Sequence, residues 1–214
     1  MYSPMPQFNT WVIKLGGALL AADELREWLT ACSARAVAVR CVVVVGGGAL
    51  ADEVRALQRR HGFDDVLAHE LALEAMRMHA RVLHALAPAL PLCEALVAAQ
   101  LPSVPAGSVL WTPPATFAPP ALPMSWAVTS DSIALWLAEA LGAQGLVLVK
   151  SLGSSALQAA TDTGLAAQGV VDDYFDTLLE KSTVPVRVAS KYCLDDFIAG
   201  CARGVLPGIP VGGV

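Results

Sequence analysis

The stretch VVVVGGGALADEVRAL, residues 42–57, decides the fold, because four valines lead into three glycines and a helical run follows at once. The valine run is too apolar to alternate and is typical of a strand covered on both faces. The run after the glycines places Leu50, Val54 and Leu57 on one side of an amphipathic helix. Consecutive glycines are costly to order and add no packing. The stretch therefore indicates a turn at which bare backbone is needed.

Short apolar runs and helical runs alternate along the rest of the chain. Residues 101–124 are rich in proline, and we expect them to form a surface loop that leads to a functional segment. The order of elements calls for a mostly parallel sheet between helical layers. Strands are predicted at 11–15, 41–45, 109–111, 145–150 and 184–190. Helices are predicted at 23–34, 49–60, from 64 or 65 to about 86, 130–143, 172–181 and 193–201.

Composition sets the size and class of the protein. The 214 residues suit one α/β domain or at most two small ones. With 55% hydrophobic and only 15% charged residues, the chain can bury a large core. The mean hydropathy of +0.55 also favours a homo-oligomer that hides part of the surface.

Several classes of partner are disfavoured by the same composition. A net charge of −5 and the lack of a basic stripe argue against nucleic-acid binding. No apolar run reaches the roughly 20 residues of a membrane span, and residues 1–10 lack the pattern of a signal peptide. The five cysteines include no C-x-x-C pair, as expected for reduced thiols. We therefore expect a cytoplasmic protein that acts on a small molecule.

Two glycine turns share the same context, a buried strand before and a helix after. Gly16 and Gly17 follow the first strand, and Gly46, Gly47 and Gly48 follow the second. In parallel α/β sheets such turns lie at the carboxyl ends of strands, where helix N-termini and bare backbone bind phosphates. A tight turn without a ligand is the alternative for either turn alone. The pair, with a lysine at position 14 just before the first, favours an anion site.

A dinucleotide-binding fingerprint is the rival interpretation of the second turn. Gly46-x-Gly48-x-x-Ala51 matches G-x-G-x-x-[GA]. That class expects an acidic residue after a second strand about 20 residues on, but this region is His69-Glu70 within a predicted helix. The P-loop pattern is absent. The dinucleotide fit is therefore weak.

Four segments together resemble the amino acid kinase superfamily. They are IKLGGALL (13–20), VVVVGGGALADEVR (42–55), TSDSIALWLAEALGA (129–143) and LVLVKS (146–151). Three more segments are similar to the branch that phosphorylates an (aminomethyl)furan-methyl phosphate to its diphosphate in methanofuran-type C1-carrier biosynthesis. These are HELALEAMRMHARVL (69–83), LPMSWAVTSDSIA (122–134) and VVDDYF (170–175).

The resemblance implies a three-layer αβα sandwich with a mainly parallel sheet, as one domain over 1–214. It implies an acceptor-binding half at about 1–125 and a nucleotide-binding half at about 126–214, with ATP and Mg²⁺ as cofactors. Lys14 would stabilise the transferred phosphoryl group and Asp131 would orient Lys14. The glycines of both turns would bind phosphate. The helix that carries His69 would line the acceptor pocket, together with Thr129 and Ser130.

The chain departs from the family pattern in two places. Many members carry a Thr-Asp-Val-type turn after the third strand, where this chain has Lys150-Ser151-Leu152-Gly153. We expect Lys150, Ser151 and Gly153 to bind nucleotide. The alternative for Lys150 is that it only ends the strand. Acetylglutamate-type members carry a second lysine where this chain has VVDDYF, and Lys150 is the candidate to replace its charge. Asp172 and Asp173 are either Mg²⁺ ligands or a solvated helix start. If nothing replaces the second lysine, the protein is a catalytically silent binding or storage member of the fold.

Overall fold

The computed structural model describes residues 9–34, 39–97, 100 and 107–212, which fold around one seven-stranded sheet. The strands lie in the order β3-β4-β2-β1-β5-β6-β7, and every neighbouring pair is parallel except β6 and β7. The strands are β1 (Asn9–Leu15), β2 (Val39–Val45), β3 (Leu92–Cys93), β4 (Val109–Trp111), β5 (Gly145–Lys150), β6 (Val186–Ser190) and β7 (Ile209–Val211). The predicted α/β class with a mainly parallel sheet is confirmed.

The centre of the sheet is the point at which the chain changes direction. From β1 the chain passes to β2 on one side, and it later returns to β5 on the other side. All seven residues of β2 are buried, as the valine run predicts. Ligands in such sheets bind beyond the carboxyl ends of the strands at this switch point. The glycine turns after β1 and β2 and the end of β5 therefore meet at the expected place for a site.

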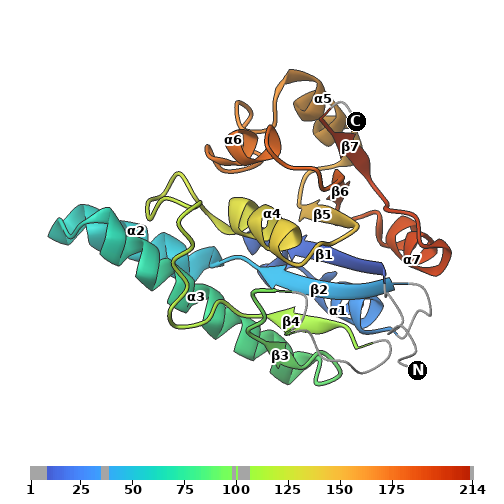
Figure 1. Ribbon diagram of the computed structural model, residues 1–214, viewed down its shortest axis with the longest axis horizontal. Helices are drawn as coiled ribbons and strands as arrows, with labels where there is room; N and C mark the ends of the chain where they lie inside the picture. Colours follow the sequence, from blue (N-terminus) through green and yellow to red (C-terminus); the bar gives the residue numbers. More distant parts are fainter. Residues whose placement is uncertain (1–8, 35–38, 98–99, 101–106, 213–214) are drawn as a thin grey trace, which may run out of the picture.

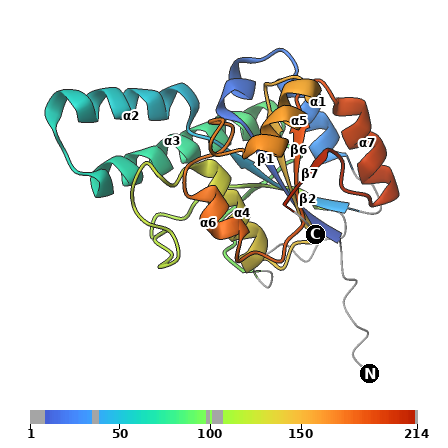
Figure 2. The same ribbon diagram turned by 90° about the horizontal axis from the view of Figure 1, so that it is seen from above.

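Helices cover both faces of the sheet (Figures 1 and 2). Helices α4 and α6 pack on one face, where Val12 and Phe175 belong to the same buried cluster. Helices α1 and α7 pack on the other, where Trp28 lies 4.9 Å from Phe197, ring centre to ring centre. The helices are η1 (Gly17–Ala21), α1 (Leu25–Ser33), α2 (Gly48–His61), α3 (Asp65–Leu86), α4 (Ser130–Ala140), α5 (Ser154–Thr163), α6 (Phe175–Leu179) and α7 (Leu194–Arg203).

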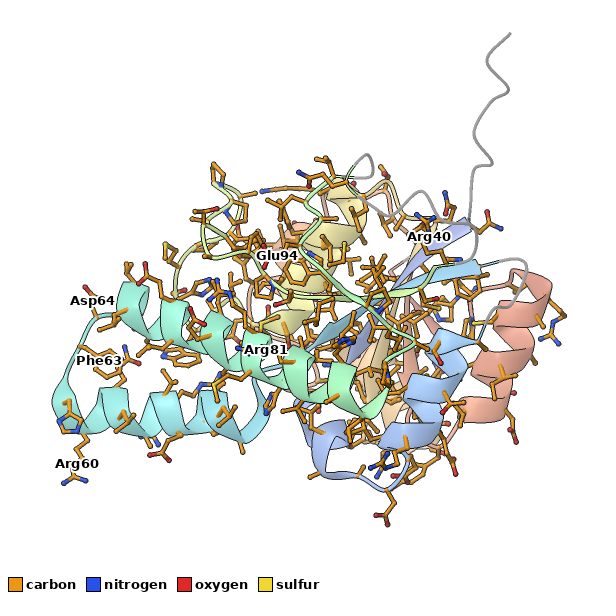
Figure 3. The ribbon with its side chains drawn as sticks, turned by 90° about the horizontal axis from the view of Figure 1, so that it is seen from below. Arg40, Arg60, Phe63, Asp64, Arg81 and Glu94 are labelled. Carbon is orange, nitrogen blue, oxygen red and sulfur yellow. The ribbon has the colours of Figure 1, made fainter. Side chains whose placement is uncertain are left out.

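A helical hairpin of α2 and α3 extends beyond the sheet (Figure 2). Helix α2 ends at His61 and is capped by Gly62, whose φ of 74° is in the left-handed region that favours glycine. Asp64 then caps α3 by accepting a hydrogen bond from the N–H of Leu67. Arg60, Phe63 and Asp64 lie at the far end of the hairpin (Figure 3). The base of the hairpin therefore lies beside the glycine turns, while its tip stands in solvent.

The proline-rich segment wraps across α3 and returns to the sheet. The prediction of an irregular region holds for residues 112–124, whereas 101–106 lie outside the described residues. Arg77 of α3 fixes the segment, because its guanidinium donates to the carbonyls of Pro113 and Pro114 at 2.7 Å each. Tyr174 also donates its backbone N–H to the carbonyl of Ala127. The loop is therefore tied to two different elements before it reaches α4.

Three features of the fold differ from the predictions. Residues 172–174 precede α6 instead of forming its first turn, because the Asp172 side chain binds another helix. Helix α5 was not predicted, and it buries only Leu157 and Ala160 of its ten residues. The short strands β3 and β7 were also missed. In the described part of the chain, no helix is both long and apolar enough to cross a membrane. The residues tested for a signal peptide lie mostly outside that part.

Candidate active site

Two lysines at the ends of neighbouring strands share one carboxylate at the start of α4. Lys14 is the last but one residue of β1, and Lys150 is the last residue of β5. Their ammonium groups lie 2.8 Å and 2.7 Å from Oδ1 of Asp131. The exposed fractions of the Lys14, Lys150 and Asp131 side chains are 5%, 11% and 7%. The structure thus brings Lys14 and Asp131 together as predicted, and it adds Lys150 to the same cluster.

The cluster is held in a charged state by its own members. Burial by itself would raise the pKa of Asp131, but the two lysines lower that pKa below its ordinary value. Burial and the neighbouring Lys14 lower the pKa of Lys150 to about 8, against the opposite effect of Asp131. At neutral pH, Asp131 is therefore ionised and Lys150 is largely protonated. Two ammonium groups that share one carboxylate can exchange it for phosphoryl oxygens.

The first turn of α4 is held from outside the helix by Asp172. This carboxylate accepts hydrogen bonds from the N–H and hydroxyl of Thr129, both at 2.9 Å, and from the N–H and hydroxyl of Ser132. Only 8% of Asp172 is exposed. The prediction that Asp172 is part of a solvated helix start is therefore wrong. The neighbouring Asp173 is exposed.

The carboxylates of the site are already engaged, which bears on the expected Mg²⁺. Asp131 binds two lysines and Asp172 binds four donors. The described residues contain no group of three or more His, Cys, Asp or Glu side chains that could hold a metal ion. These side chains therefore do not fit a protein-held Mg²⁺ site, and the Mg²⁺-ligand interpretation of Asp172 is not supported.

A cavity of about 450 Å³ opens beside Lys14. The two glycine turns form its inner end, and α2, α3 and the segment before α4 form its walls. Its polar lining outside the glycine turns is limited to seven side chains among the described residues. They are Lys14, Asp52, Arg55, His69, Trp126, Thr129 and Ser130. The structure therefore places His69, Thr129 and Ser130 in the cavity wall, as the acceptor prediction requires.

The glycines at the inner end are set by close approach of backbones. A Cβ on Gly17 would lie 2.9 Å from the Cα of Gly48, and one on Gly47 would lie 2.6 Å from the Cβ of Ala51. Gly48 has a φ of 48°, and a Cβ there would lie 3.0 Å from the ring of His79. Larger residues do not fit at these positions. The two turns therefore touch each other across the floor of the cavity.

The predicted phosphate role divides the glycines into two groups. The N–H groups of Gly16 and Gly46 donate to the carbonyls of Val149 and Leu15, so they extend the sheet. Gly47 and Gly48 begin α2, where the first N–H groups of a helix lack intrahelical partners. Phosphate binding through N–H groups stays a prediction for Gly17, Gly47 and Gly48, and Gly16 and Gly46 shape the turns.

At the outer end of the cavity, a cationic side chain packs against an aromatic ring. The guanidinium of Arg55 lies 4.3 Å from the centre of the Trp126 ring. The indole N–H of Trp126 donates to Oε1 of Gln58 at 2.6 Å, which ties the loop to α2. An apolar middle therefore lies between an anion-binding inner end and this cationic, aromatic outer end.

Two histidines of α3 differ in what they do. His69 is 6% exposed, and burial lowers its pKa although the Ser125 carbonyl raises it. The ring is therefore neutral at neutral pH and is not a phosphate-binding cation. His79 lies 2.9 Å, through Nδ1, from the carbonyl oxygen of Gly46. This contact stabilises the glycine turn after β2.

The other predicted nucleotide residues lie on the far side of Lys150. Ser151 and Gly153 are exposed at the turn between β5 and α5. A second hollow of about 340 Å³ lies next to this turn and is lined by Ser154, Ser190 and Cys193, among others. The second hollow reaches this turn through Ser154, and Lys150 lines neither this hollow nor the cavity beside Lys14.

Sequence reasoning missed three contributors, Arg55, Gln58 and His79, and it singled out Asp172 in a different role. Each acts through a partner far along the chain, such as Gln58 on Trp126 or Asp172 on Thr129. The one local signal is that Arg55, Gln58 and His79 lie on helices that flank the glycine turn.

Comparison with known proteins agrees with the geometry. A sequence model of the amino acid kinase family matches residues 9–153. The chain therefore belongs to the amino acid kinase family, whose name supports a phosphotransferase. Comparison with curated protein sequences gives no significant match.

Three solved structures are similar to the whole chain. The crystal structure of uridylate kinase from Archaeoglobus fulgidus has a TM-score of 0.65 at 19% identity, and the match covers 94% of this chain and 99% of that one. UMP kinase from Bacillus anthracis has a TM-score of 0.64 at 13% identity over 96% of each chain. Aspartate kinase from Synechocystis has a TM-score of 0.62 at 16% identity, over 96% of this chain and 40% of that one. At these identities the likeness establishes the shared fold.

Proposed function

We propose that the protein is an ATP-dependent phosphotransferase that acts on a small acceptor which already carries a phosphate. The observation that carries the proposal is the cluster of Lys14, Lys150 and Asp131 beside a cavity with a glycine floor. Phosphoryl transfer depends mainly on positioning and charge stabilisation, which such a cluster supplies. A phosphate acceptor needs no strong general base, and His69 is the only imidazole in the described cavity lining.

The reaction step assigns a role to each group. An oxygen of the acceptor phosphate bonds to the γ-phosphorus of ATP, and the bond from that phosphorus to the β–γ bridging oxygen breaks to release ADP. Lys14 and Lys150 leave Asp131 in part to contact the oxygens of the group in transfer. Asp131 keeps both amines aligned. The N–H groups of Gly17, Gly47 and Gly48 bind the acceptor phosphate.

The acceptor that we propose is an (aminomethyl)furan-methyl phosphate, converted to its diphosphate for a methanofuran-type C1 carrier. Two of the segments that resemble this branch contribute to the cavity wall. Residues 69–83 supply His69 and Met76, and residues 122–134 supply Trp126 and Thr129. A small ring with one phosphate matches a cavity with an anion-binding end and an apolar, aromatic remainder.

The nucleotide is assigned to the β5–β6 side, where Lys150 ends β5 and the turn through Ser151 and Gly153 leads to Ser154, which lines the second hollow. Magnesium would arrive bound to the phosphates of ATP and would neutralise their charge. This arrangement corresponds to an acceptor half at about 1–125 and a nucleotide half at about 126–214 of one domain.

We also propose that the protein is a homo-oligomer through the outer face of α3. This helix leaves Leu67, Met78 and Val82 exposed by 42%, 52% and 56%. Light scattering at micromolar concentration should give more than the monomer mass, and Met78→Glu with Val82→Glu should reduce it. A monomeric wild-type protein would contradict this part of the proposal.

The test is ADP release, coupled to an optical assay, with ATP and Mg²⁺. The acceptor panel is the furan phosphate, UMP, isopentenyl phosphate, acetylglutamate and aspartate. The expected result is turnover on the furan phosphate, its loss in Lys14→Ala and its retention in Lys181→Ala, which removes an exposed lysine. Turnover on another acceptor would keep the class and replace the substrate.

The second candidate is a silent binding or storage protein of the same fold. The altered turn at Lys150–Gly153 favours it, because many family members carry a different sequence there. ATP binding without ADP release on any acceptor would support it and would contradict our proposal. Binding of a reduced nicotinamide dinucleotide is measured separately, and failure to bind would exclude a dinucleotide-dependent enzyme.

A further inference from the structure

The carboxylate of Asp172 has no role in the reaction step proposed above, although it lies close to the lysine cluster. It binds neither lysine. It accepts four hydrogen bonds, two from Thr129 and two from Ser132. These residues stand on either side of Asp131 in the sequence. Among the described residues, no other carboxylate accepts four hydrogen bonds from the start of a helix.

Helix α4 depends on this carboxylate for its first turn. Thr129 is the N-cap residue, but its hydroxyl makes no capping bond to its own helix. It donates instead to Asp172. Asp172 takes the place of the cap, because it accepts from the N–H of Ser132, which has no partner within the helix. The backbone on both sides of Asp131 is thereby fixed to one external group.

The charge of Asp172 also reaches the lysines. The charged groups that face Lys150 in the described structure are Lys14 on β1, Asp131 on α4 and Asp172 before α6. Lys14 disfavours a second ammonium, and the two carboxylates favour it. Burial raises the pKa of Asp172, against the hydrogen bonds from Ser132 and Thr129, which lower it.

We propose that Asp172 is a positioning residue of the phosphotransferase, which fixes the first turn of α4 and with it holds Asp131 between the two lysines. The inference rests on the proposed function for its kinetic consequence. Its effect on Lys150 is a property of the protein alone and can be measured without an acceptor.

Two substitutions separate the hydrogen bonds of Asp172 from its charge. In Asp172→Asn, the amide oxygen can still accept from the N–H groups of Thr129 and Ser132, and the amide NH₂ can donate to the Ser132 hydroxyl. The cap is kept and the charge is lost. Asp172→Ala removes both. Asp173→Asn is the matched control, because the neighbouring Asp173 is exposed.

The measurement is competitive acetylation of lysines with acetic anhydride across a pH series, read by mass spectrometry. Only the unprotonated amine reacts, so the pH dependence reports the ionisation of Lys150. In Asp172→Ala, Asp131 is no longer held between the lysines, so we expect the ionisation of Lys150 to move to lower pH than in the wild type. Asp172→Asn, which keeps the cap, should move it less, and Asp173→Asn should leave it unchanged. An unchanged ionisation in Asp172→Ala, in a protein that still unfolds cooperatively, would overturn the proposal.

Kinetics test the positioning half. In Asp172→Ala, kcat should fall by on the order of ten- to a hundredfold, since small misplacements of reacting groups cost this much. The KM for ATP should change less. Asp172→Asn should restore part of kcat. Equal kcat in the wild type and in Asp172→Ala would contradict the positioning role. If the wild type itself has no turnover, the proposed function fails, while the acetylation result still decides the role of Asp172.

Discussion

The turns after β1 and β2 and the turn after β5 follow one plan, a buried strand and then glycine, but they differ in the space around the glycine. On the side where we propose that the acceptor binds, called the acceptor side below, a Cβ on Gly17 would meet the Cα of Gly48 at 2.9 Å. On the proposed nucleotide side, a Cβ on Gly153 would meet nothing within 4 Å. Similar glycine signals in the sequence therefore have different physical causes. Close backbone contact requires glycine on one side, and the other side tolerates a side chain.

The lysine cluster joins the two sides, and its loss should have the largest effect. Asp131→Ala would leave two buried ammonium groups without their counter-charge. We expect the free energy of unfolding to fall by about 3–5 kcal/mol, together with loss of turnover. Urea denaturation followed by circular dichroism measures the change. Asp176→Ala, at an exposed site, is the control and should differ little from the wild type.

The acceptor side should be the more sensitive of the two glycine turns. Gly17→Ala forces a Cβ against the backbone of Gly48, and that backbone cannot move without shifting α2. We expect a cost of about 1–3 kcal/mol, as for other overpacked sites, and a raised KM for the acceptor. A variant with wild-type stability and KM would show that the close approach of the two turns is not needed.

Protonation of Lys150 should set the alkaline limit of activity. Its pKa is about 8 in the folded protein against an ordinary value of 10.5. As pH rises through 8, the folded state loses this proton before the unfolded state does. Turnover should therefore fall above pH 8, while the contribution of this group to stability rises between pH 8 and 10.5. A pH–rate profile beside pH-dependent urea unfolding checks both signs. The same slope in Lys150→Met would assign it to another group.

The smallest effect is expected on the nucleotide side. Gly153 has φ −69° and ψ 156°, which alanine adopts without strain. Gly153→Ala should change the free energy of unfolding by less than about 0.5 kcal/mol. The KM for ATP should also stay close to the wild-type value. A large rise in that KM would mean that nucleotide phosphates approach this backbone as closely as Gly17 approaches Gly48.

The parts of the structure that sequence reasoning predicted are those with local signals. The valine run of β2 is buried on both faces, and Lys14 stands just before a glycine turn, so both could be read from neighbouring residues. The role of Asp172 could not, because its partners are 40 and 43 residues away. Helix α5 was missed for another reason. Only two of its ten side chains are buried, so few large apolar residues mark it in the sequence.

The residues of the site also divide into those with a local sequence signal and those that depend on distant partners. Lys14 and Asp131 were paired through a family pattern, and their contact at 2.8 Å agrees with it. The presence of Lys150 on the same carboxylate oxygen depends on the register that aligns β1 with β5, which pairs Lys14 with Leu148. No pattern within either strand carries that register. Tertiary pairing therefore determines which lysine completes the cluster.

The central claim is that Lys14 and Lys150 act as one unit on the transferred phosphoryl group. The most direct test is a double-mutant cycle on kcat for ADP release, with Lys14→Ala, Lys150→Met and the double variant. If the two amines act together through Asp131, each single change should abolish most of the turnover and the double change should add little. Effects that add independently, or full turnover in either single variant, would contradict the claim.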